Sequence, residues 1–150
     1  MALIDLDTLA ASSGPLLGLD PGTKTLGLAI SDATRLIASP LTTIRRKKFT
    51  PDATRLLDLY RENAASALIV GLPLNMDGSA GPRVQSVRDF CTNLMRLEDV
   101  PVFQWDERLS TAAVTRQMID ADVSRATRAE MVDAQAAAYI LQGVLDRLRA

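Results

Sequence analysis

The sequence of 150 residues contains no histidine and a single cysteine, and these absences exclude several kinds of chemistry. Without histidine the chain cannot build a Ser-His-Asp or a Cys-His nucleophile system. One cysteine and no histidine also exclude an ordinary structural zinc site and an internal disulfide. Catalysis would therefore have to rest on carboxylates, lysine, tyrosine and oxygen-bound cations such as magnesium.

Long apolar runs and a strong net charge are also missing. No apolar run reaches roughly 18 residues, so we expect no contact with a membrane. The acidic N-terminus lacks the basic start of a signal peptide, which favours a cytoplasmic location. Because the net charge is −1, local groups of basic residues would have to attract any nucleic acid. The run from Arg45 to Lys48 is one such group and is expected on the far end of the predicted meander of the first three strands, although a solvated surface explains it equally well.

The chain does contain enough apolar residues for one folded domain, since 47% of them are hydrophobic. Residues 1–13 are predicted to form an arm of uncertain order, and residues 14–150 a single domain. The first three predicted strands can pair as an antiparallel meander, and the wholly apolar fourth is typical of a buried parallel strand. This order predicts an α/β layered domain. Strands are expected near 16–19, 25–31, 36–44, 67–71 and 102–105. Helices are expected from about 51, with Thr50 as N-cap, and at 82–97, 110–121 and 128–148.

Asp20 stands where the first buried strand ends. The apolar run Leu-Leu-Gly-Leu precedes it and the turn sequence Pro-Gly-Thr-Lys-Thr follows. This pattern predicts a strand, a tight turn and a second strand, with a carboxylate at the edge of the sheet. An ionised group there is costly unless a positive charge meets it. The candidates are a metal ion and the metal of a bound nucleotide.

Glu107 is a second acid at the end of a predicted strand. Strand alternation places it on the same side as Phe103 and Trp105. A strand-end acid that simply reaches water is the plain alternative, and Asp106 competes with Glu107 for any role.

Asp133 is a third acid, and it lies well inside the last predicted helix. Thr127 and Glu130 stand at the spacing of a capping box and mark the start of that helix. Asp133 shares the apolar stripe of the helix, so it is predicted to face the core. A buried ion pair with an arginine is the alternative to a metal ligand. The stripe consists of Ala137, Ile140, Leu141, Val144 and Leu148.

Asp20, Glu107 and Asp133 together suggest one metal site. A carboxylate cluster without histidine suits hard divalent cations. Two such ions can activate water and stabilise the leaving oxygen when a phosphodiester is cleaved, without a covalent nucleophile from the protein. The residue types therefore favour a metal-dependent nuclease.

Four segments of the sequence resemble the motifs of the YqgF (RuvX) family, and they occur in the family's order. They are LDPGTKTLG at 19–27, VGLPLNMDG at 70–78, DERLST at 106–111 and DAQAAAYIL at 133–141. The resemblance covers roughly residues 14–148. It implies an RNase H-like three-layer fold, with a mixed five-stranded sheet of three antiparallel strands and then two parallel ones, flanked by helices.

The same resemblance implies a function and a set of site residues. It implies a nuclease that processes the 5′ end of the 16S rRNA precursor, with a Holliday junction resolvase in DNA recombination and repair as the alternative. Asp20, Glu107 and Asp133 would be the catalytic acids and would hold Mg2+ or Mn2+. The family often has lysines just before the closing-helix aspartate, where this chain has arginines. Apart from the resemblance, basic residues near the acids, after the long loop and at the start of the closing helix are the cations expected to contact nucleic acid: Lys24, Arg83, Arg108, Arg125 and Arg128.

Two other functions fit parts of the sequence. An Asp-x-Gly-Thr turn after a strand also opens the ATP-binding domain of actin-like and sugar kinases, but those proteins need two such domains and this chain has room for one. A nucleic-acid-binding scaffold without catalysis is the other, and the three intact acids argue against it. The sequence does not choose between rRNA precursor and branched DNA, between endo- and exonuclease action, or between a monomer and a weak homodimer.

Overall fold

The computed structural model describes residues 3–75, 77–109 and 125–150, with the backbone alone over residues 125–132. Five strands form one mixed sheet in the order β3-β2-β1-β4-β5. The strands β1, β2 and β3 are antiparallel neighbours, and β4 and β5 are parallel to β1. The predicted meander and the two parallel strands are therefore confirmed. The strands are β1 (Leu16–Pro21), β2 (Thr25–Ser31), β3 (Ala38–Arg45), β4 (Ala67–Leu72) and β5 (Val102–Asp106).

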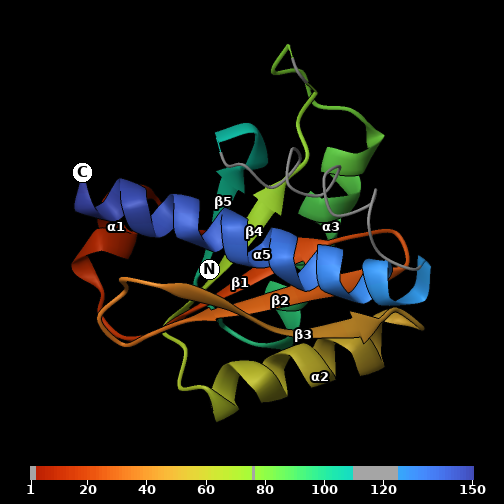
Figure 1. Cartoon of the computed structure of the whole chain (residues 1–150), viewed down its shortest axis with the longest axis horizontal. Helices are drawn as coiled ribbons and strands as arrows, with labels where there is room; N and C mark the ends of the chain where they lie inside the picture. The colour runs from red at the N-terminus through yellow and green to blue at the C-terminus, as the bar shows by residue number, and fades with distance from the viewer. Residues whose placement is uncertain (1–2, 76, 110–124) are drawn as a thin grey trace.

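Helices cover both faces of this sheet, which gives the predicted three layers (Figure 1). The long helix α5 (Arg125–Arg149) crosses one face, and the short helix α1 (Leu6–Ala11) packs into the same core cluster. The opposite face is covered by α2 (Phe49–Glu62) and α3 (Pro82–Leu97). A short 3-10 helix, η1 (Glu107–Leu109), follows β5. The helix expected at about 110–121 lies outside the described residues.

Two helix starts differ from the prediction. The α2 helix begins at Phe49 with Lys48 as N-cap, so Thr50 is not the cap. The buried Asp52 carboxylate accepts hydrogen bonds from the Lys47 backbone N–H at 3.1 and 3.3 Å, which extends the ordered turn toward β3. Likewise α5 already includes Arg125, so Thr127 lies inside the helix and does not mark its start.

The strand β3 begins later than predicted, at Ala38 in place of residue 36. The Asp32 carboxylate accepts hydrogen bonds from the backbone N–H groups of Leu36 and Ile37, so these two residues belong to the β2–β3 turn. The hydroxyl of Thr34 and these N–H groups lower the pKa of Asp32 to about 2.

The apolar stripe of α5 faces the core as predicted. Ala137, Ile140, Leu141 and Val144 are fully buried. Cys91 on α3 is also fully buried, so it is a core residue, and burial raises the pKa of its thiol to about 11.

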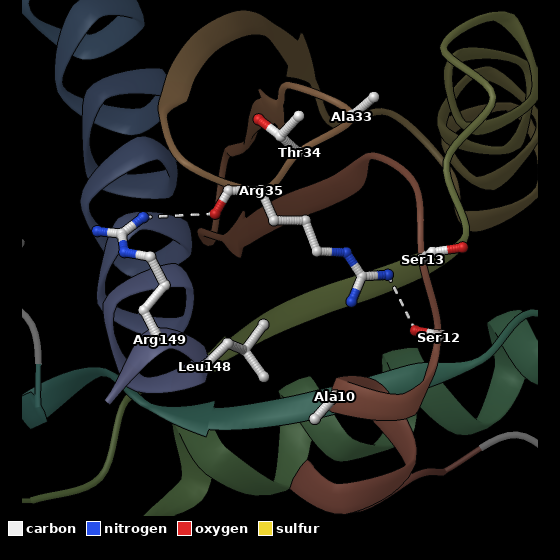
Figure 2. Close-up of a pocket in the computed structure, with 8 residues that line it drawn as sticks. All are labelled: Ala10, Ser12, Ser13, Ala33, Thr34, Arg35, Leu148 and Arg149. Atoms are coloured by element: carbon white, nitrogen blue, oxygen red, sulfur yellow. Dashed lines mark hydrogen bonds between the residues drawn. The ribbon is translucent and has the colours of Figure 1, made fainter.

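Hydrogen bonds from Arg35 hold the arm before β1, whose order the sequence left open. The guanidinium of Arg35 donates hydrogen bonds of 2.7 to 3.0 Å to the carbonyls of Gly14 and Leu9 and to the hydroxyls of Ser12 and Ser66. Arg149 at the end of α5 approaches the same turn, and Figure 2 shows both arginines beside a pocket of about 310 Å³. One turn therefore connects the N-terminal arm with the end of the last helix.

Among the helices of the described ranges, none combines the length and the apolar character that a membrane crossing would need.

Candidate active site and the adjoining basic pocket

Asp20 is a buried acid on the α5 face of the sheet. Its side chain is 6% exposed. Strand alternation puts it on the same face as Leu16 and Gly18, and Gly18 lies against α5. Asp20 pairs with Gly27 on β2, and by continuation of the β1–β4 register it lies beside Gly71 on β4. A glycine therefore stands on each side of this carboxylate.

Gly27 allows the backbone of α5 to approach the sheet at Asp133. A Cβ atom at position 27 would overlap the carbonyl group of Asp133, so any residue with a side chain would push the helix away. The Asp133 carboxylate turns back to the sheet and accepts a hydrogen bond from the Thr25 hydroxyl. Asp133 thus has a hydroxyl from the first residue of β2 as a partner.

Gly71 makes the corresponding space for Glu107. A Cβ atom at position 71 would lie 2.7 Å from Ile140 Cδ1 and 3.5 Å from Glu107 Oε2. Trp105 pairs with Gly71, and two residues later Glu107 opens η1 on the same face. The predicted alternation of β5 is confirmed, because Phe103 and Trp105 belong to the core under α5.

The three acids therefore reach one face of the sheet around the end of β1. They do not form a complete set of metal ligands. Within residues 3–75, 77–109 and 125–150, no three carboxylate, thiol or imidazole groups lie close enough together to hold a metal ion. Their chemistry still fits a hard cation, because all three are oxygen donors and two glycines leave room between them. Their role as metal ligands stays a prediction.

Asp106 has a different partner from Glu107. Its carboxylate accepts hydrogen bonds from the Arg108 backbone N–H at 3.0 Å and from the Arg108 guanidinium at 2.6 to 3.0 Å. These guanidinium bonds hold the pKa of Asp106 below its ordinary value, and they raise that of Arg108. The guanidinium also lies beside Gly78 in the loop after β4. Asp106 thus positions Arg108 at the rim of the site.

Only some of the other cations predicted to contact phosphate lie near Asp20. Lys24 is exposed in the turn after Asp20. Arg83 on α3 donates a hydrogen bond of 2.9 Å to the carbonyl of Pro21, the residue directly after Asp20. Arg125 and Arg128 lie in the first turns of α5, and their side chains are outside the described residues.

The basic run from Arg45 to Lys48 lies beside the same turn, which the sequence did not suggest. We expected it on the far end of the meander, and this expectation is wrong. Thr25 pairs with Arg45, and Arg46 donates to the Lys24 carbonyl through its backbone N–H at 2.8 Å. The Arg46 guanidinium donates to the Gly22 carbonyl at 2.6 Å. The antiparallel register of a β2–β3 hairpin would have predicted this neighbourhood.

A pocket of about 390 Å³ opens between this run and α3. Arg46 lies over the ring of Phe90, with 5.5 Å between the guanidinium carbon and the ring centroid, so the α2 and α3 side of the sheet supports the pocket. Among the residues that the structure describes, Asp52 contributes the one carboxylate of the lining. The polar lining consists otherwise of Thr23, Arg46, Lys47, Lys48, Arg83 and Ser86.

Solved structures define the class of this fold. The chain is similar to RuvC of Thermus thermophilus in complex with a Holliday junction substrate, with a TM-score of 0.57, 17% identity, and coverage of 91% of this chain and 97% of that one. It is also similar to the yeast mitochondrial Holliday junction resolvase Ydc2, with a TM-score of 0.51, 12% identity, and coverage of 96% of this chain and 85% of that one. The mixed sheet and its helices are therefore those of an RNase H-like fold.

Sequence comparison then gives the family. The family model described as "RuvX: Holliday junction resolvase" matches residues 14–147. A protein of Methylocella silvestris named "Putative pre-16S rRNA nuclease" is 61% identical over 150 residues, which cover 98% of this chain and 93% of the relative. A protein of the same name from Phenylobacterium zucineum is 56% identical over 149 residues, covering 98% and 96%. The chain belongs to the RuvX family, as its motifs predicted.

Proposed function

We propose that this chain is a metal-dependent nuclease that trims the precursor of 16S rRNA. The observation that carries this proposal is the placement of Asp20, Glu107 and Asp133 on the α5 face around the end of β1. A chain without histidine has few other groups that could activate water. The names of the relatives support the choice of rRNA precursor as substrate.

Asp20, Glu107 and Asp133 would hold one or two divalent cations such as Mg2+ or Mn2+. When bound, such a cation supplies the positive charge that activates the attacking water and stabilises the leaving oxygen. The Thr25 hydroxyl orients Asp133 toward the sheet. Arg108, held by Asp106, supplies a cation at the rim that can bind a phosphate of the substrate.

The experiment compares cleavage of two substrates by the purified protein. A 16S rRNA precursor with its 5′ extension and a four-way DNA junction are each incubated with Mg2+, with Mn2+ and with EDTA. We expect metal-dependent shortening of the rRNA precursor by the wild-type chain and none by Asp20→Asn. Asp7→Asn, which removes an exposed acid on α1, is the matched control and should cleave as the wild type does. Cleavage that persists in EDTA or in Asp20→Asn would contradict the proposal.

Junction cleavage is the second candidate function. The description of the matching family and the fold of the RuvC complex favour it. A junction resolvase needs two active sites on one substrate, so a homodimer that cuts the junction symmetrically and leaves the rRNA precursor intact would select this function.

A further inference from the structure

We propose that the pocket between the β3–α2 connection and α3 binds a backbone phosphate of the nucleic-acid substrate other than the one that is cleaved. This inference rests on the proposed nuclease function and extends it, because it adds a second contact point for the strand. The pocket takes a phosphodiester group with part of its nucleotide, since its volume of about 390 Å³ falls within the range of ligand pockets, roughly 300–1,000 Å³.

The charge of the lining selects an anion. Four cationic side chains, those of Arg46, Lys47, Lys48 and Arg83, face one carboxylate, that of Asp52. Asp52 is buried and accepts hydrogen bonds from the Lys47 backbone N–H, so part of its charge is directed at the backbone. In a chain with a net charge of −1, this concentration of positive charge is a local feature.

The cations are also positioned before any ligand arrives. Arg46 is held by the Gly22 carbonyl at 2.6 Å and by the ring of Phe90, and Arg83 is held by the Pro21 carbonyl at 2.9 Å. Each guanidinium has further N–H groups that can donate to phosphate oxygens. Preorganised donors lose less entropy on binding than free side chains do. Hydroxyls of Thr23 and Ser86 add neutral donors to the lining.

The location favours a phosphate of the nucleic acid over an acidic protein segment. Both guanidiniums bind carbonyls of the turn that begins directly after Asp20, so the pocket and the acid lie on opposite faces of the same turn. A strand that places one phosphate near Asp20 can continue across Thr23 and Lys24 and place another in the pocket. The pocket therefore fixes the register of the strand relative to the acids.

The test uses Lys47→Gln/Lys48→Gln, because these side chains are exposed and do not hold the turn. The matched control is Arg96→Gln/Arg147→Gln, which removes two exposed cations from the ends of α3 and α5. Binding of a fluorescent single-stranded fragment of the rRNA precursor is measured in EDTA over a range of salt. We expect the pocket variant to bind roughly tenfold more weakly and its salt slope to fall by about 0.7, the value for one phosphate contact on a single strand.

A scan with methylphosphonate linkages then identifies the phosphate. One neutral linkage, away from the cleavage position, should weaken binding to the wild-type chain several-fold and leave the pocket variant unaffected. Equal behaviour of the two double variants, or a scan without such a position, would overturn the inference. Cleavage by the wild-type chain is followed in parallel with Mg2+. If the pocket variant binds as tightly as the control variant while the wild-type chain cleaves, only the pocket proposal is refuted. If the wild-type chain binds the fragment and does not cleave it, only the proposed nuclease function is refuted.

Discussion

The two faces of the sheet differ at the turn after Asp20 in both packing and charge. On the α5 face, glycines at positions 18, 27 and 71 let the helix lie against the strand backbones, and the acids collect there. On the α2 and α3 face, leucine and valine side chains fill the core, and the cations of the pocket collect at its edge. One turn thus separates the face that carries the proposed metal ligands from the face that carries the proposed phosphate pocket.

The largest expected effect is on the acidic face. Asp20→Asn or Asp133→Asn should reduce cleavage by at least roughly 100-fold, because each would remove one of the proposed metal ligands. The same variants should leave the metal-free protein as stable as the wild type or more so, because clustered carboxylates repel each other. Steady-state cleavage and thermal melting in EDTA check both. A large drop in melting temperature would instead indicate a structural role for the acids.

The close packing of α5 can be broken by adding single methyl groups. Gly27→Ala should lower the free energy of unfolding by about 2 kcal/mol or more, because the new Cβ meets the backbone of Asp133, which cannot rotate away. Gly18→Ala should cost less, since its Cβ would lie 3.0 Å from Leu141 Cβ. Gly71→Ala should cost least, because it meets the flexible end of Ile140. Chemical denaturation of the three variants gives the order, and a different order would contradict this account of the face.

A smaller effect is expected from Arg46 on the basic face. Arg46→Ala removes a hydrogen bond to Gly22 and the contact with Phe90, so the free energy of unfolding should fall by about 1 kcal/mol. Nucleic-acid binding should weaken as well. Arg46→Lys keeps the charge and should restore part of the binding but little of the stability. If Arg46→Lys is as stable as the wild type, the guanidinium geometry does not hold the turn.

The smallest effect concerns Cys91, which is buried on the core side of α3. Burial raises the pKa of its thiol from 9.0 to about 11, so alkylation by iodoacetamide at pH 8 should be negligible until the protein unfolds. The folded state keeps the proton that the unfolded state loses, so the stability from this group should decline as the pH rises from about 9 to 11. Rapid labelling of the folded protein would show that this side of the core opens easily.

The sequence predicted the acidic face better than the basic one, and the reason is physical. Strand alternation and the helical period are local rules, so they placed Glu107 on the same face as Trp105 and Asp133 on the side of α5 that meets the sheet, where Asp133 is half-buried. The glycine contacts under α5 depend on which helix crosses the sheet and on how closely it approaches the strands. No local sequence pattern predicts either. From the sequence alone, Gly27 and Gly71 are residues of low strand propensity within predicted strands.

The basic pocket was missed for a different reason. Its lining comes from the β1–β2 turn, the β3–α2 connection and α3, which are far apart in the sequence. The run from Arg45 to Lys48 was visible, but its position depends on the register of β2 with β3. Asp52 also contributes through its bonds to Lys47, and these start α2 earlier than Thr50 and Pro51 had suggested. The charge of the run is visible in the sequence, whereas its neighbours follow only once the register of β2 with β3 is known.

The position of α5 in the chain has a consequence for synthesis on the ribosome. The core under α2 and α3 uses residues from Leu17 to Val102, whereas the core under α5 needs Ala137 to Leu145, which are made after all five strands. Domains consolidate as their contacts become available, and contacts between distant segments form late. The basic face can therefore pack before the acidic face exists. If both proposals hold, a growing chain can bind a backbone phosphate before it is able to cleave a phosphodiester bond.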